Sequence, residues 1–171
     1  MDAAGIQRYR TAYDEAGIAA DSVPPQALID LASQADLIAT SDLPRAVASA
    51  ERLAPERPIV LSPLLRETVL EAPNWLPLRW PLPAWEALIH AQWAYQILRG
   101  TDAPPEELKR AGTAATWLTK HSDESASIVV VTHGVFRRLL AERLARKEWE
   151  PDPGRQSYDT WSAWSFRRKL R

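Results

Sequence analysis

Cysteine is absent from this sequence, and several other residue types are scarce. The chain has 171 residues, with no Cys, one Met, two Phe and six Gly. The lack of cysteine excludes disulfide bonds, thiolate metal sites and a thiol nucleophile. A metal site would have to be built from carboxylates and the three histidines. We therefore expect no metal and look for chemistry that needs neither metal nor thiol.

An excess of charge and long hydrophobic runs are also missing. The 21 basic and 22 acidic side chains give a formal net charge of −1, so we expect binding neither to nucleic acid nor to a membrane surface. The apolar run at 128–131 is far shorter than the roughly 18 residues that a membrane-spanning helix needs. The first residues lack the apolar segment of a secretory signal. We expect a cytoplasmic protein with one domain over residues 1–171.

Proline and tryptophan are abundant, with 14 and 8 residues respectively. Four of the tryptophans, at positions 75, 80, 85 and 93, fall in or just after a proline-interrupted stretch, within residues 71–93. One interpretation is a long loop that its large rings anchor to the body of the protein. The other is an aromatic lid over a pocket. Both interpretations are open at this point.

Hydrophobic periodicity predicts strands that alternate with helices. Strands are expected at 36–40, 58–62 and 127–132, with a further edge strand within 158–166. The run at 127–132 is β-branched and typical of a strand buried on both faces of a parallel sheet. Helices are expected near 3–16, 25–35, 41–54, 83–98, 103–120 and 133–148. The alternation predicts an α/β fold, a three-layer sandwich with a mostly parallel central sheet.

Two of these helices have expected N-caps, and both caps are polar side chains. Ser41 or Asp42 precedes the helix within 41–54, and Thr101 or Asp102 precedes the helix within 103–120. Each of these side chains can accept a hydrogen bond from a free N–H group of the first helical turn.

Two strand-to-helix junctions carry side chains that suit an anion. Arg45 lies in the first turn of the helix after the strand at 36–40, and His133 and Gly134 lie where the strand at 127–132 becomes a helix. Ligands of parallel α/β sheets gather at the carboxyl ends of the strands, where helix N-termini favour negative charge. The glycine permits close approach of a ligand. Singly, each of these residues is more often an ion-paired or structural side chain; together they suggest a phosphate site.

Three strings then resemble one family in order and spacing. They are TSDLPRAVASAERLA at 40–54, LLRE at 64–67 and VVVTHGVFRRLL at 129–140. They are similar to the motifs of the histidine phosphatase superfamily, the phosphoglycerate mutase-like enzymes, and the resemblance covers roughly residues 25–145. It implies a phosphoglycerate mutase-like fold and phosphomonoester hydrolysis or phosphoryl transfer through a phosphohistidine, without metal or organic cofactor. The expected ligand is a phosphorylated small molecule or an oxyanion.

The resemblance also implies roles for individual residues. Arg45 matches a phosphate-binding arginine, and Glu67 matches the acid that protonates the leaving oxygen. His133 matches a histidine that donates a hydrogen bond to the phosphate, with Gly134 beside it at the substrate.

One family motif is not in the sequence. The family begins with a strand that ends in Arg-His-Gly, whose histidine is the nucleophile, and residues 1–35 contain no histidine. His90 and His121 neither follow a strand nor adjoin a glycine, so both are interpreted as structural. We therefore expect the chain as given to be inactive.

Two explanations compete for the missing strand. In the first, the natural protein begins upstream of an internal Met; in the second, the chain is a catalytically inactive relative. The lost strand is central in the family's sheet, and unpaired backbone groups in a core cost about 1–3 kcal/mol each. This cost favours the first explanation. A further alternative is a protein-interaction domain that binds a partner through its Trp-rich segment or its basic end at 166–171.

Overall fold

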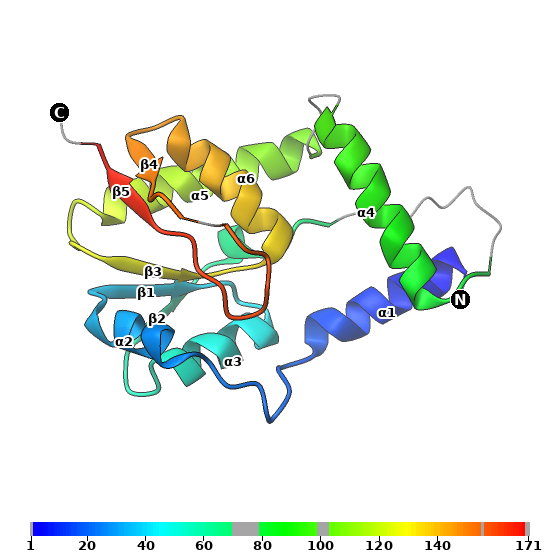
Figure 1. Cartoon of the computed structure of the whole chain (residues 1–171), viewed down its shortest axis with the longest axis horizontal. Coiled ribbons are helices and arrows are strands. Elements are labelled where there is room, and N and C mark those ends of the chain that lie inside the picture. Colours follow the sequence, from blue (N-terminus) through cyan, green and yellow to red (C-terminus); the bar gives the residue numbers. More distant parts are fainter. Residues whose placement is uncertain (1, 70–78, 99–102, 155, 170–171) are drawn as a thin grey trace.

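The computed structural model describes residues 2–69, 79–98, 103–154 and 156–169 (Figure 1). Its helices are α1 (Ala3–Glu15), α2 (Gln26–Gln34), α3 (Pro44–Leu53), α4 (Leu82–Leu98), α5 (Pro105–His121) and α6 (Gly134–Ala145), with a 3-10 turn η1 (Pro63–Leu65). Its strands are β1 (Leu37–Thr40), β2 (Ile59–Leu61), β3 (Ile128–Val131), β4 (Trp149–Pro151) and β5 (Phe166–Arg168). The predicted alternation and three of the predicted strands are confirmed.

Strands β1, β2 and β3 form a parallel sheet in the order β2-β1-β3. Ile38 of β1 pairs with Ile59 on one side and with Val129 on the other. Parallel neighbours need a crossover between them, which helices provide here. The carboxyl ends of β1 and β3 consequently lie side by side, each leading towards the N-terminus of a helix.

Helices cover both faces of this sheet, as Figure 1 shows. On one face α2 and α3 form a buried cluster with β1 that includes Ala32, Ile38 and Leu53. On the other face α5 and α6 form a larger cluster that includes Leu118 and Phe136. Burial of apolar surface contributes about 25 cal/mol per Å² and drives this packing. The helix-sheet-helix order confirms the predicted three-layer α/β architecture.

Strand β3 differs from the expectation of a strand buried on both faces. All four of its residues are only half-buried. Within the described part of the chain β3 pairs with β1 alone, so it ends the sheet on that side. Val129, Val131 and Trp161 each pack against the buried cluster on the α2 and α3 face. An edge position explains the partial exposure, because only one side of the strand has a neighbour.

The strand predicted within 158–166 is wrong for most of its length. Residues 158–165 form turns and irregular chain, and the strand that follows, β5, pairs antiparallel with β4 in a separate two-stranded sheet. Trp161 has a φ of 56°, which no strand residue adopts. The indole of Trp161 donates to Ser22 at 3.0 Å, whereas that of Trp164 donates to the Ser157 carbonyl at 2.9 Å. The alternating tryptophans thus anchor a loop.

The predicted polar N-cap of α3 is also wrong. The helix begins at Pro44 with Leu43 as its N-cap, and no side chain caps it. A proline at the first helical position leaves one fewer N–H group without a partner, and its φ already suits a helix. Ser41 accepts a hydrogen bond from the Leu43 N–H at 3.3 Å, and Asp42 binds Arg66 instead. Thr101 and Asp102 lie outside the described residues.

Part of the Trp-rich segment can be placed. Trp85 of α4 is fully buried, with its ring centre 5.9 Å from that of Trp80. Trp93 lies against Arg138 of α6, 5.6 Å from the ring centre to the guanidinium carbon. These contacts favour the anchoring interpretation for α4; residues 70–78, with Trp75, lie outside the described residues.

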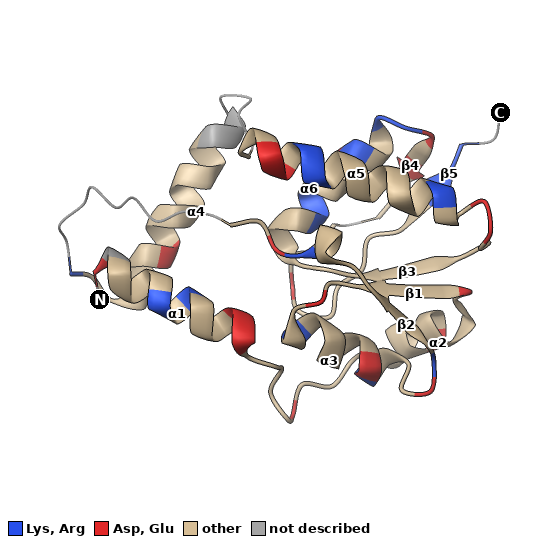
Figure 2. Cartoon of the chain, turned by 180° about the vertical axis from the view of Figure 1, so that it is seen from behind, with Lys and Arg blue, Asp and Glu red and all other residues tan. Residues whose placement is uncertain are grey.

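Basic and acidic residues are interspersed along the chain, and α1, α3 and α5 each carry both kinds (Figure 2). Among the described helices, none is both long enough and apolar enough to cross a membrane.

Candidate functional site

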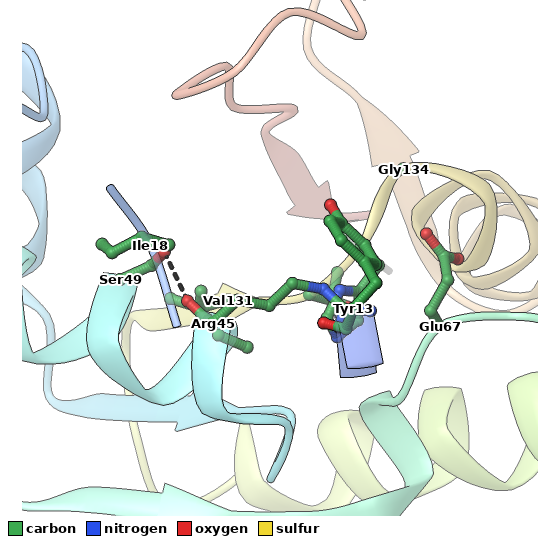
Figure 3. A pocket seen from close by; sticks show the side chains of 10 residues that line it. Tyr13, Ile18, Arg45, Ser49, Glu67, Val131 and Gly134 are labelled. Carbon is green, nitrogen blue, oxygen red and sulfur yellow. Dashed lines mark hydrogen bonds between the residues drawn. The ribbon is translucent and has the colours of Figure 1, made fainter. Parts of the chain in front are cut away.

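A pocket of about 200 Å³ opens at the carboxyl end of β3 beside the first turn of α3 (Figure 3). Its walls come from α1, α3, the chain after η1, and the junction of β3 with α6. The lining residues are Tyr13, Ile18, Arg45, Ala46, Ser49, Glu67, Val131, Thr132, His133 and Gly134. The structure therefore brings the four residues selected from the sequence into one pocket.

Arg45 extends from α3 across the pocket towards Tyr13 (Figure 3), and its side chain is only 10% exposed. Its Nη1 donates to the Tyr13 carbonyl oxygen and to Asp14 Oδ1, both at 3.0 Å. The guanidinium carbon lies 4.5 Å from the centre of the Tyr13 ring. The end of α1 therefore supplies a carboxylate that balances the Arg45 charge.

His133 immediately precedes α6 and is buried. Its Nε2 is inaccessible to solvent and has no hydrogen-bond partner within the described part of the chain. Burial, followed by the charge of Arg45, lowers the pKa of His133 to about 4. The ring is consequently neutral at pH 7, and the nitrogen without a partner can donate or accept a hydrogen bond according to its tautomer.

Glu67 follows η1 and is half-buried, with its carboxyl group against the start of α6. Its Oε1 accepts hydrogen bonds from the N–H groups of Thr68 at 2.8 Å and Phe136 at 3.0 Å. Burial raises the pKa of Glu67, while these N–H groups and Arg45 lower it without cancelling the rise. A carboxyl group with a raised pKa is better suited to hold a proton for donation.

Sequence reasoning missed several residues of the pocket wall. Ser49 lies one helical turn after Arg45, so its position could have been derived from helical spacing; its hydroxyl donates to the Arg45 carbonyl at 2.8 Å. Tyr13 and Ile18 gave no signal, because their place depends on how α1 and the chain after it lie against α3. None of the described tryptophans lines the pocket, whose aromatic wall is Tyr13.

The two other histidines lie elsewhere. His90 on α4 and His121 on α5 each place Nδ1 against a carbonyl oxygen of their own helix, at 2.7 and 2.8 Å. Among the described residues, no group of three His, Asp or Glu side chains is arranged to hold a metal ion.

The sequence match settles the family. The model of the histidine phosphatase superfamily (branch 1) matches residues 25–164. The chain belongs to the histidine phosphatase superfamily. The matched range includes Arg45, Glu67, His133 and Gly134, and it leaves α1 outside. Of the solved structures, that of a phosphoserine phosphatase mutant from Entamoeba histolytica in complex with phosphoserine has 19% identity and a TM-score of 0.49 to this superfamily member, covering 80% of this chain and 74% of the other. No curated protein sequence matches this chain.

Proposed function

We propose that the pocket binds the phosphate group of a small phosphomonoester and that the protein, with a nucleophilic histidine in place, hydrolyses it or transfers its phosphoryl group. The observation that carries the proposal is the buried Nε2 of His133, which lacks a partner and belongs to the same pocket as Arg45. A buried polar atom without a partner is costly, so a native structure rarely keeps one where no ligand or water binds. A phosphate oxygen suits both groups.

The charges around the pocket favour a weak anion site. Arg45 and the first turns of α3 and α6 attract negative charge. A neutral His133 adds a hydrogen bond but no charge. Asp14 already neutralises Arg45, so an incoming phosphate must displace this carboxylate or share the guanidinium with it.

Glu67 is the proposed proton donor. Cleavage of the ester leaves negative charge on the leaving oxygen, and a protonated carboxyl group beside it neutralises that charge in the transition state. Its raised pKa supports this role.

The nucleophile is the remaining requirement. The family resemblance implies a histidine on a strand that ends in Arg-His-Gly. Within the described residues β3 has β1 as its single neighbour, and a strand added parallel to its outer side would end beside His133. We propose that phosphoryl transfer requires this strand and that the 171-residue chain alone binds phosphate without turnover.

The phosphate site can be tested by thermal denaturation in phosphate or vanadate. The oxyanion should raise the Tm of the chain, and Arg45→Ala should abolish the rise. A ligand that binds only the native state stabilises it by about 2.7 kcal/mol at one hundred times Kd, which is several degrees for a protein of this size. With one arginine in the site, tens of millimolar oxyanion is needed.

Arg52→Ala is the matched control, because Arg52 lies on the same helix but binds the carbonyls of Ala19 and Ser22 outside the pocket. Sulfate and chloride at equal ionic strength separate site binding from general salt effects. Equal rises in the chain, Arg45→Ala and Arg52→Ala would refute the phosphate site.

Replacement of Asp14 should have the opposite effect. Asp14→Asn is expected to strengthen vanadate binding roughly two- to fivefold, which corresponds to the free energy of a partly exposed ion pair. The side chain of Asp14 is 52% exposed, so the removed interaction is of this modest size. Isothermal titration calorimetry would measure the change, with Asp30→Asn on α2 as the control. Weaker binding to Asp14→Asn would show that Asp14 helps to hold Arg45 in its binding position.

A further inference from the structure

Arg110 on α5 binds the segment that carries Glu67. Its Nη1 donates to the carbonyl oxygens of Leu64 at 3.0 Å and Arg66 at 2.7 Å, and its Nη2 donates to the carbonyl oxygen of Glu67 at 3.3 Å. One guanidinium group thus satisfies three carbonyls within four consecutive residues. Such groups need partners when the chain is irregular, because no strand or helix supplies them.

The guanidinium is itself held on two sides. Glu107, one turn earlier on α5, forms an ion pair with it, and the Arg110 side chain is only 19% exposed. Its guanidinium carbon lies 4.2 Å from the centre of the buried Phe136 ring. Phe136 is also the residue whose N–H binds the Glu67 carboxyl group. Arg110 therefore contacts both segments between which this carboxyl group lies.

We propose that Arg110 is a positioning residue, which holds the backbone of residues 64–67 so that the Glu67 carboxyl group stays between this loop and the first turn of α6. The inference rests on the proposed function, in which Glu67 donates the proton. Arg110 acts through the loop, because it donates hydrogen bonds to the carbonyl oxygens of this segment and not to the Glu67 carboxylate.

Several groups act on the Glu67 carboxyl group. They are the N–H groups of Thr68, Val135 and Phe136 and the cations Arg45 and Arg137. His133 lines the same pocket as Glu67, and Arg110 binds its carbonyl oxygen. The N–H groups and Arg45 favour the charged form, and burial favours the protonated form more strongly.

The two ways in which Arg110 could act predict opposite changes. If Arg110 acted only as a nearby positive charge, its removal would raise the pKa of Glu67 further. If it holds the loop, its removal admits water to the carboxyl group, and the pKa falls towards its usual value of 4.5. The sign of the change therefore separates a positioning residue from a simple charge.

The test is a pH titration of the ligand-free chain followed by NMR through the Phe136 amide, whose N–H is bound to the carboxyl group. In Arg110→Met we expect the pKa reported by this amide to fall by about half a unit or more. The change in the chemical shift of the amide over the titration should also become smaller. Arg110→Lys, which keeps the charge and some donors, should lie between Arg110→Met and the unchanged chain. Arg138→Met is the matched control, because Arg138 also has an ion pair and an aromatic contact.

An unchanged or raised pKa in Arg110→Met overturns the proposal, and so does an equal fall in Arg138→Met. If Arg110→Met does not fold, Arg110→Lys decides by the same criterion. The titration uses no oxyanion, so its outcome is independent of whether Arg45 binds phosphate.

Discussion

The 171-residue chain is expected to hydrolyse p-nitrophenyl phosphate no faster than buffer, while a chain that also has the Arg-His-Gly strand should turn it over at least about a thousandfold faster. In-line attack needs an imidazole nitrogen about 3–3.5 Å from phosphorus. His133 lines the pocket, where we propose that it binds the phosphate. His90 and His121 bind carbonyls of their own helices. No described histidine is left for attack.

The longer chain for this comparison carries, ahead of residue 1, a short apolar strand that ends in Arg-His-Gly. Steady-state kinetics of both chains measures the effect. Turnover by the 171-residue chain that His133→Ala or His90→Ala abolishes would show that the nucleophile is assigned wrongly. A longer chain that is as inactive as the 171-residue chain would favour the alternative of a domain that binds phosphate ligands or a partner without catalysis.

Acid should destabilise the chain through His133 by roughly 3 kcal/mol between neutral pH and pH 4. The pKa of His133 is about 4 in the folded chain, whereas the ordinary value for histidine, which applies to the unfolded chain, is 6.5. Below pH 6.5 the unfolded chain takes up a proton that the folded chain does not, so the contribution of the neutral ring is present above pH 6.5 and is lost as the pH falls to about 4. Below that value both states are protonated and the loss stops.

Urea unfolding of the chain and of His133→Asn at several pH values would measure this contribution. Glu67 works in the opposite direction, because a raised pKa means that its protonation favours the folded state. The difference between the two proteins cancels Glu67 and the other shared groups. Stability curves that run parallel from pH 7 to pH 4 would contradict the burial of a neutral His133.

The parts predicted correctly from the sequence are those that local pattern determines. The β-branched run at 128–131 is typical of a strand. Arg45 and His133 lie where the chain passes from a strand into a helix, so parallel pairing of the strands places both at the same end of the sheet. Neither conclusion needs knowledge of distant contacts. Glu67, in contrast, was predicted from the family resemblance alone.

The missed parts depend on contacts between distant segments. Asp14 reaches Arg45 because α1 lies against α3, 31 residues away in sequence, and no periodicity encodes that contact. Strand β4 was not expected, since Trp149–Pro151 is short and ends in a proline that suits only an edge. The alternation within 158–166 was misleading, because turn hydrogen bonds of Ser157 and Ser162 to Asp159 shape this segment.

The order of the sheet also determines when the pocket can form. Strands β1 and β2 are close neighbours along the chain, but the Asp36 to Ser127 contact that starts the β1 and β3 pairing spans 91 residues. Contacts between such distant residues form slowly, because the chain loses the entropy of loop closure before it gains the free energy of the contacts. During synthesis, the pocket that contains Arg45 and His133 therefore cannot form until most of the chain has left the ribosome. A phosphate ligand can bind only after this late closure, so it should slow unfolding far more than it speeds folding.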